Sequence, residues 1–221
     1  MPARTDGLHK SVSEAAAISR AFPGSRKLFL WYGLCAGICL FVLASAYLQI
    51  KYRQQPLQKY RSLPDFQLVD QDGRSFGLGD LKGKVWLADF VYTTCPGPCP
   101  MVTRNVSQLQ DAAFQSGDVR FVTFTMDPKD DSPAVLKQYG EKFHATPGKW
   151  IFLTGDPEKI FSLVRNGFTL AIADATPNAP IVHSTKLALV DRDGTVRGYY
   201  DGIGEVPSEQ ILRDIQRLLH E

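Results

Sequence analysis

Residues 85–100 read VWLADFVYTTCPGPCP, a long apolar run that leads directly into two cysteines separated by three residues. The apolar part, Val85 to Tyr92, is typical of a β-strand that is buried on both faces. After the second cysteine, apolar residues recur at helical spacing, which predicts a helix from about Pro100 to about Phe114. The sequence therefore places Cys95 and Cys99 between the end of a central strand and the start of a helix.

The rest of the C-terminal part alternates between strand-like and helix-like segments. Asp-Gly pairs predict hairpin turns, whereas Ser-Pro and Asp-Pro pairs predict the first residues of helices. The expected strands are 66–69, 74–76, 119–126, 150–153, 186–190 and 197–200, and the expected helices are 133–143, 157–165 and a last one capped by Ser208. This order predicts an α/β fold in which helices flank a mixed sheet. Because the cysteine pair follows the first central strand, we expect a thioredoxin-like domain over residues 63–221.

An uncharged stretch of 23 residues precedes this domain, LFLWYGLCAGICLFVLASAYLQI at positions 28–50. As a helix it would be roughly 35 Å long, enough to cross a hydrocarbon core of about 30 Å. We therefore expect an N-terminal tail (1–27), a transmembrane anchor (28–50) and a polar linker (51–62). The alternative is a cleavable signal peptide, because Ala-Ser-Ala at 44–46 resembles a cleavage site. The length of the apolar stretch and of the tail before it favours the anchor.

The charges of the chain are split between its two ends. The formal net charge of +2 combines a net of +7 over residues 1–61 with a net of −5 over residues 62–221. An acidic domain without a Lys/Arg-rich run gives no basis for nucleic-acid binding. Lys and Arg are balanced on the two sides of the predicted anchor, so the positive-inside rule does not orient it. We expect a single-pass protein with its domain on the non-cytoplasmic side, in the periplasm or its equivalent, because this is the arrangement of a signal anchor.

The position of the cysteine pair predicts reactive thiols but does not choose their reaction. A helix N-terminus lowers the pKa of a cysteine, and the resulting thiolate both attacks disulfides and binds soft metals such as Cu(I) or zinc. Thioredoxin-type oxidoreductases have two residues between their cysteines, whereas Cys95 and Cys99 are separated by three. Spacing alone leaves a metal site and a redox disulfide equally open, with a structural disulfide as a third reading. Cys35 and Cys39 lie inside the predicted anchor, where cysteine ordinarily acts as a small apolar residue.

A histidine would favour a metal site, and the chain has four. His9 lies in the tail, His220 is the penultimate residue, and His144 is expected in a loop after a helix. His183 differs because it enters the strand at 186–190, and in a thioredoxin-type topology that segment faces the reactive cysteines. The alternative is a loop histidine that only forms hydrogen bonds.

Three blocks of the sequence resemble the signature blocks of the SCO/SenC family of copper-binding cytochrome c oxidase assembly proteins. The blocks are DFVYTTCPGPCPMV at 89–102, TMDPKDDSP at 125–133 and IVHSTKLALVDRDGTV at 181–196. They occur in matching order, and the similarity runs through the whole of residues 63–221. The predicted membrane anchor also fits the family.

The resemblance implies a thioredoxin-like domain in which Cys95, Cys99 and His183 bind one copper ion, as Cu(I) or Cu(II). Two thiolates and one imidazole form a soft set that suits Cu(I). The implied role is transfer of copper during assembly of the CuA centre of cytochrome c oxidase, rather than catalytic turnover. The implied partner is the oxidase subunit that carries CuA, or another copper donor or acceptor protein. Asp127 matches an acidic position that recurs near the family site; the alternative is a turn residue at the end of a strand.

The chain departs from the family pattern at three places. Many members have an acidic residue where this chain has Val182, a histidine in place of Thr94, and an acidic and aliphatic pair in place of Gly97-Pro98. These differences remove charge around the predicted site and leave a second function open. The alternative is a thiol-disulfide oxidoreductase or thiol peroxidase that uses Cys95 and Cys99 without the histidine, with reduction of acceptor cysteines or redox sensing as related roles.

Overall fold

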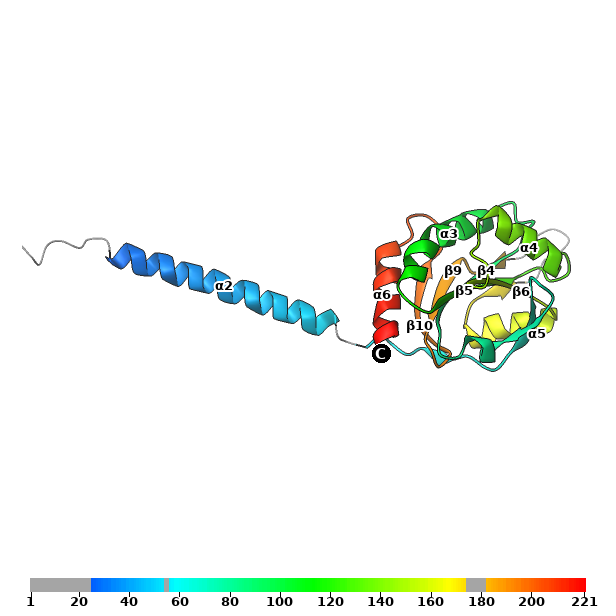
Figure 1. Ribbon diagram of the computed structural model, residues 1–221, viewed down its shortest axis with the longest axis horizontal. Helices are drawn as coiled ribbons and strands as arrows, with labels where there is room; N and C mark the ends of the chain where they lie inside the picture. The colour runs from blue at the N-terminus through cyan, green and yellow to red at the C-terminus, as the bar shows by residue number, and fades with distance from the viewer. Residues whose placement is uncertain (1–24, 54–55, 174–181) are drawn as a thin grey trace, which may run out of the picture. The chain divides into compact units, whose positions relative to one another are not determined.

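The computed structural model of the 221-residue chain describes residues 25–53, 56–173 and 182–221. These residues belong to two compact units, 1–55 and 56–221. The first unit contains one long helix, and the second is an α/β domain (Figure 1).

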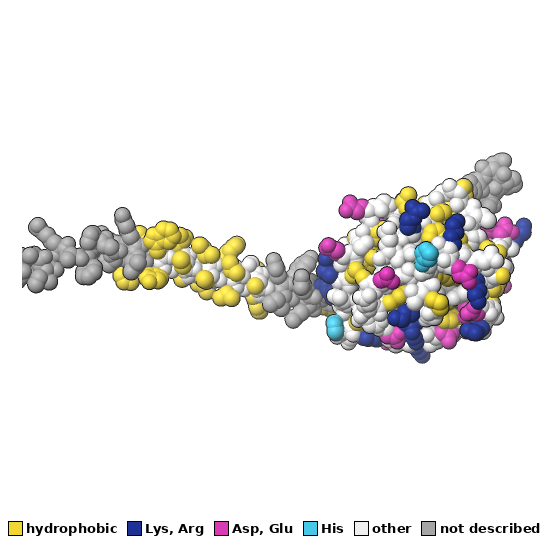
Figure 2. Space-filling model, turned by 45° about the horizontal axis from the view of Figure 1, so that its top comes forward, with side chains coloured by type: hydrophobic (Ala, Val, Ile, Leu, Met, Phe, Trp, Pro, Cys, Tyr) yellow, Lys and Arg dark blue, Asp and Glu magenta, His cyan; other side chains and the backbone are white. Residues whose placement is uncertain are grey.

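The helix of the first unit is α2 (Ser25–Arg53). Its segment Phe29–Leu48 is long and apolar enough to cross a membrane, and the side chains of that segment are not buried against other parts of the chain. Figure 2 shows hydrophobic side chains on the surface of this helix, and Cys35 and Cys39 are exposed among them. The helix is thus compatible with the predicted membrane anchor.

The domain is built on one sheet with the strand order β1-β10-β9-β4-β5-β6-β2-β3. The central strands β4, β5 and β6 run parallel, and β9 runs antiparallel to β4. The strands are β1 (Arg61–Ser62), β2 (Gln67–Asp70), β3 (Ser75–Gly77), β4 (Val85–Val91), β5 (Val119–Thr125), β6 (Trp150–Thr154), β9 (Lys186–Val190) and β10 (Thr195–Asp201). The predicted mixed sheet is confirmed. A separate antiparallel pair, β7 (Ile172–Ala173) and β8 (Val182–His183), was not predicted.

Helices cover both faces of the sheet. Figure 1 shows α3 and α4 on one side of the central strands and α5 on the other. The helical elements are η2 (Leu78–Leu81), α3 (Cys99–Gln115), α4 (Pro133–Lys142), α5 (Pro157–Ser162), the π-helical turn η3 (Leu163–Gly167) and α6 (Ser208–His220). On the α5 side, aromatic rings fill the core, and Phe90 and Phe168 meet edge to face with their centroids 5.0 Å apart. All seven residues of β4 are buried, which fixes the strand that leads to the cysteines.

Two helix starts differ from the sequence prediction. Helix α3 begins at Cys99 rather than at Pro100, so the second cysteine lies in the first turn of the helix. Ser208 is not the N-cap of α6, because the N-cap is Pro207 and the Ser208 hydroxyl donates instead to the carbonyl of Val206 at 3.3 Å. The prediction failed because a serine before an apolar periodic segment can stand just inside a helix as well as at its cap.

The caps of α4 and α5 are confirmed and differ in strength. Asp156 Oδ1 accepts hydrogen bonds from the backbone N–H groups of Glu158 at 2.8 Å and Lys159 at 3.2 Å, whereas Ser132 Oγ accepts one long bond of 3.4 Å. We expect Asp156→Ala to lower the free energy of unfolding by about 1 kcal/mol, as loss of an N-cap typically does. Urea denaturation measures the change. Ser208→Ala is the control and should leave stability nearly unchanged, because that hydroxyl caps nothing; an equal loss in both variants would contradict the cap assignment.

Candidate metal and thiol site

The two cysteines occupy the junction between β4 and α3, as predicted. Cys95 lies in the loop after β4 and is 8% exposed, whereas Cys99 is fully buried in the first turn of α3. Both are present as thiols rather than as a disulfide. The residues between them, Pro96, Gly97 and Pro98, are exposed. The pair therefore lies at the surface end of a buried strand, with one sulfur nearer to solvent than the other.

The sulfur of Cys95 collects several hydrogen bonds. Burial raises the pKa of its thiol, but bonds from the Cys99 thiol, from the backbone N–H groups of Cys99 and Gly97, and from the Tyr92 hydroxyl outweigh burial. The net effect is a pKa below the ordinary cysteine value, because each of these donors stabilises the thiolate. The same contacts affect Tyr92, whose pKa is raised to about 12 by burial and by its bond to Cys95.

Cys99 has the opposite tendency. Burial raises the pKa of its thiol well above the ordinary value, and its bond to Cys95 raises the pKa further. Its helix position is held by Thr103, whose hydroxyl donates to the Cys99 carbonyl at 3.0 Å and also contacts the Tyr139 hydroxyl at 2.8 Å. In the metal-free protein, the Cys95 thiol therefore ionises more readily than the Cys99 thiol, which makes Cys95 the better nucleophile of the pair.

This asymmetry predicts selective alkylation. We expect iodoacetamide at neutral pH to modify Cys95 at least roughly tenfold faster than Cys99, because the reaction needs a thiolate and access to it. Peptide mass spectrometry of the full chain in nonionic detergent measures each rate separately. Equal rates at the two positions, or faster reaction at Cys99, would contradict the assignment.

A buried carboxylate lies beneath the pair, within β4. Asp89 is 1% exposed, and its Oδ1 accepts a hydrogen bond of 2.8 Å from Thr123 Oγ1, which in turn accepts one of 2.8 Å from Trp150 Nε1. Its Oδ2 has no hydrogen-bond partner among the described residues. Burial raises the pKa of Asp89 to about 7, although the bond from Thr123 partly opposes this shift. The carboxylate also contributes to the raised pKa of the Cys99 thiol.

The structure places His183 only by its backbone. It lies in β8, where it is paired with Ile172 of β7. Its side chain lies outside the described part of the structure, so its approach to the two thiols stays a prediction. The other predicted surface histidines within the described part, His144 and His220, are both exposed. His9 lies outside the described residues.

Asp127 lies in the turn after β5. Its backbone N–H donates to Thr125 Oγ1 at 2.9 Å, and its carbonyl accepts from the backbone N–H groups of Asp130 and Asp131. Burial, followed by the charges of Asp130 and Asp131, raises the pKa of its carboxyl group. The charge of Asp127 also raises the pKa of the Tyr92 hydroxyl, which is hydrogen-bonded to Cys95. Asp127 therefore lies in the neighbourhood of Cys95.

The donor set fits a soft metal ion. Among the side chains that the structure describes, no three His, Cys, Asp or Glu residues converge as a complete metal site. The Cys95 and Cys99 thiols do converge, since they are hydrogen-bonded to each other at the N-terminus of α3. Two adjacent thiolates are ligands that Cu(I) and zinc prefer, and a third donor would have to come from outside the described side chains.

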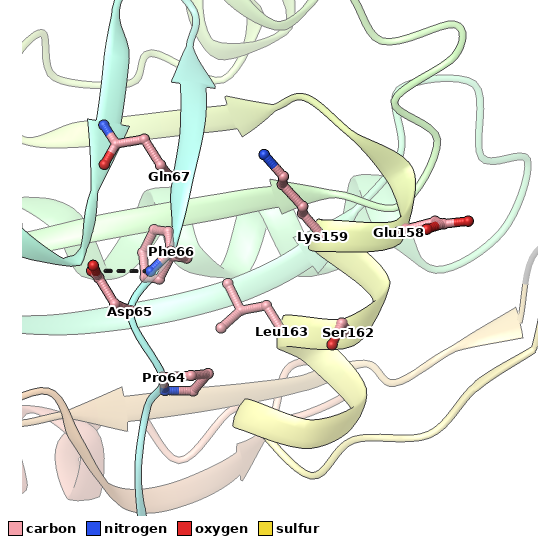
Figure 3. Close-up of a pocket in the computed structure, with 8 residues that line it drawn as sticks. All are labelled: Pro64, Asp65, Phe66, Gln67, Glu158, Lys159, Ser162 and Leu163. Carbon is pink, nitrogen blue, oxygen red and sulfur yellow. Dashed lines mark hydrogen bonds between the residues drawn. The ribbon is translucent and has the colours of Figure 1, made fainter.

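A pocket of about 600 Å³ lies elsewhere, between the segment leading into β2 and helix α5 (Figure 3). It is lined by residues 64–67 and by Glu158, Lys159, Ser162 and Leu163. Figure 3 shows Glu158 pointing away from the space and the Asp65 carboxylate bonded to the backbone N–H of Phe66. Its polar groups thus do not converge on one point, and the cysteine pair belongs to the other side of the sheet.

Comparison with known proteins assigns the family. Residues 54–220 match the family described as SCO1/SenC. The chain belongs to the SCO1/SenC family. The match covers the whole α/β domain, including β4, the two cysteines and the strand pair with His183, so the resemblance seen in the sequence is confirmed.

Solved structures of SCO proteins share this fold. A SCO1/SenC family lipoprotein from Bacillus anthracis str. Ames is 40% identical, with a TM-score of 0.69 over 75% of this chain and 98% of that one. BsSco, described as a member of the Sco family of cytochrome c oxidase assembly proteins and studied for a disulfide switch, is 30% identical, with a TM-score of 0.67 over 75% and 98%. ScoI from Bradyrhizobium japonicum, solved with copper bound, is 27% identical, with a TM-score of 0.60 over 72% and 99%. The predicted thioredoxin-like fold is therefore confirmed.

Three residues near the SCO1/SenC cysteine motif were missed by sequence reasoning. They are Asp89, Tyr92 and Asp131. A charged residue inside the apolar run of β4 was a usable signal for Asp89, because burial of a carboxylate is costly unless it is paired, hydrogen-bonded or neutralised. Tyr92 and Asp131 gave no comparable signal, since their contacts depend on how β4, β5 and the loop before α4 come together.

Proposed function

We propose that this protein is a membrane-anchored copper-binding protein that delivers copper to the CuA centre of cytochrome c oxidase. The observation that carries the proposal is the pair of converging thiols at the N-terminus of α3, in a family with a member solved with copper bound. Soft thiolates at a helix N-terminus suit Cu(I), and the sulfur nearer to solvent, that of Cys95, gives an acceptor a point of attack.

The proposed ligands are Cys95, Cys99 and His183. The thiolates supply the affinity for Cu(I), and the imidazole supplies a third donor that also suits Cu(II). Cys95 and Cys99 are held by β4 and α3, whereas His183 belongs to the β7–β8 pair. Copper would be the cargo of the protein. Two of its ligands would come from the junction of β4 and α3, and the third would come from the separate β7–β8 sheet.

The proposed setting is a membrane surface on its non-cytoplasmic side. Residues 28–50 would anchor the chain, residues 51–62 would act as a linker, and residues 63–221 would carry the copper. The partner would be the oxidase subunit that holds CuA, or another copper donor or acceptor protein. BsSco, a Sco family member in cytochrome c oxidase assembly, supports this choice of partner.

A copper titration of the full chain in nonionic detergent tests the proposal. Under anaerobic reducing conditions we expect one Cu(I) ion per chain after desalting, measured by elemental analysis. His183→Ala should weaken Cu(I) binding at least about tenfold. Loss of a residue that only contacts a ligand already costs about 10- to 100-fold in metal affinity, so loss of a ligand should cost no less. His144→Ala is the matched control, because that histidine is exposed and distant in sequence from the site. Failure of the wild type to retain copper would overturn the proposal, and equal affinity in His183→Ala would remove His183 from the ligand set.

A thiol-disulfide oxidoreductase is the second candidate, and the opposite pKa shifts of the two thiols favour it. A nucleophilic Cys95 with a protonated Cys99 behind it is the arrangement that attacks and then resolves a disulfide. The disulfide switch studied in BsSco supports the idea that such a pair can cycle. Dithiol reductase activity that survives in His183→Ala, together with negligible copper retention by the wild type, would favour this function over copper delivery.

A further inference from the structure

A buried carboxylate anchors the loop that carries Cys95. Asp131 lies between β5 and α4 and is fully buried. The backbone N–H of Thr93 donates to both of its oxygens, at 3.2 and 3.3 Å, and the Thr93 hydroxyl donates to its Oδ1. The hydroxyl of Thr125 donates to its Oδ2 at 2.5 Å. One side chain therefore joins the residue after Tyr92 to the last residue of β5.

The hydrogen bonds from these donors offset the free-energy cost of burying the Asp131 carboxylate. Within the described part of the chain, its carboxylate forms no salt bridge, and its hydrogen-bond donors are neutral groups of Thr93 and Thr125. A buried carboxylate is costly unless its lone pairs are satisfied. The hydrogen bonds from Thr93 to the buried Asp131 carboxylate therefore hold Thr93 in place.

The position of Thr93 matters because Cys95 is two residues further on. The backbone N–H of Cys95 donates to the Tyr92 carbonyl at 3.3 Å, which makes residues 92–95 a closed turn with Thr93 inside it. On the strand side, the Met126 N–H donates to the Val91 carbonyl at 2.8 Å and continues the pairing of β4 with β5. On the other side, residues 96–98 are exposed. Thr93 is therefore the half-buried point, held by Asp131, from which the Cys95 thiol extends.

We propose that Asp131 is a positioning residue for Cys95, acting through Thr93 to hold the first thiol in register with the second. The proposal deepens the proposed copper site and rests on it for the copper measurements. It applies equally to the thiol pair in the metal-free protein, because the same turn aligns Cys95 with the donors from Cys99, Gly97 and Tyr92. Without the anchor, the turn would sample positions in which the two sulfurs no longer meet.

Variants of Thr93 and Asp131 test the proposal in the full chain in nonionic detergent. Thr93→Val removes the hydroxyl at constant shape, Thr93→Ser keeps it, and Asp131→Asn removes the charge and one acceptor oxygen. We expect Thr93→Val and Asp131→Asn each to weaken Cu(I) binding by about 10- to 100-fold, the range for loss of an outer-shell partner. The Cu(II)–thiolate absorption band should shift in both, whereas Thr93→Ser should resemble the wild type. The double variant Thr93→Val/Asp131→Asn should be hardly worse than either single variant, because both weaken the hydrogen bond between these two side chains.

A measurement without copper separates this proposal from the proposed function. In the metal-free chain, the preference of iodoacetamide for Cys95 over Cys99 should fall at least about fivefold in Thr93→Val and Asp131→Asn, and not in Thr93→Ser. If the wild type retains no copper, the copper function fails while this alkylation result still tests Asp131. Tryptophan fluorescence checks that each variant folds. If Asp131→Asn does not fold, the comparison of Thr93→Val with Thr93→Ser tests the proposal. Unchanged alkylation preference in Thr93→Val, or an equal change in Thr93→Ser, would overturn the proposal.

Discussion

Replacing Cys95 or Cys99 with serine should weaken Cu(I) binding by more than about 100-fold, beyond the roughly 10- to 100-fold that loss of an outer-shell partner costs. Serine has nearly the same shape, but its neutral hydroxyl is a hard and weak donor for a soft ion. The two thiols are hydrogen-bonded to each other, so removal of either one leaves a single soft ligand at the N-terminus of α3. Competition with a chromogenic Cu(I) chelator under anaerobic conditions measures the affinity of each variant.

The other two cysteines of the chain provide a matched control. Cys35 and Cys39 lie on α2, in the unit that does not contain the candidate site. The double variant Cys35→Ser/Cys39→Ser should bind Cu(I) as the wild type does. If copper binding is lost in that double variant and retained in Cys95→Ser, the copper site has been assigned to the wrong cysteines.

Asp89→Asn should remove much of the pH dependence of the stability of the domain. The pKa of Asp89 is raised from 3.8 to about 7, so the folded state keeps a proton that the unfolded state releases. The contribution of this group to stability is therefore complete below about pH 4 and is lost as the pH rises through about 7. At about 1.4 kcal/mol for each pH unit, the loss amounts to about 4 kcal/mol by pH 8. Asparagine does not titrate, and it keeps an oxygen for the Thr123 hydroxyl.

Urea denaturation of the full chain at several pH values between 4.5 and 8 measures this effect. Tryptophan fluorescence is a suitable signal, because Trp86 and Trp150 are buried in the domain. Asp111→Asn, on an exposed position of α3, is the control and should keep the pH profile of the wild type. A wild-type stability that rises between pH 5 and pH 8, or an Asp89→Asn profile that matches the wild type, would contradict a protonated Asp89.

The central part of the fold could be predicted because its physical signals are local. The apolar run of β4 identifies a strand buried on both faces, and the helical spacing after it identifies α3 to within one residue. Asp156 followed by proline identifies the start of α5, since the side chain and the fixed backbone angle of proline both favour a helix N-terminus. The position of the cysteine pair follows from these elements alone.

The remaining features depend on contacts between distant segments. The Ser208 prediction failed because its local pattern fits two neighbouring positions of one helix, and packing decides between them. Asp131 meets Thr93 across 38 residues of sequence, and no local pattern indicates that contact. The predicted approach of His183 to the thiols depends in the same way on the β7–β8 pair, which gave no clear strand signal. The sequence therefore predicted the place of the cysteine pair from local patterns, whereas His183 was selected from the expected topology and its role as a ligand from the family resemblance.

X-ray absorption spectroscopy of the Cu(I)-loaded full chain tests the central claim most directly, because it reports the atoms bound to copper. A site formed by Cys95, Cys99 and His183 predicts two sulfur ligands and one nitrogen ligand, with the nitrogen lost in His183→Ala and a sulfur lost in Cys99→Ser. A spectrum with only nitrogen and oxygen ligands, or one that neither substitution changes, would contradict a copper site at these residues.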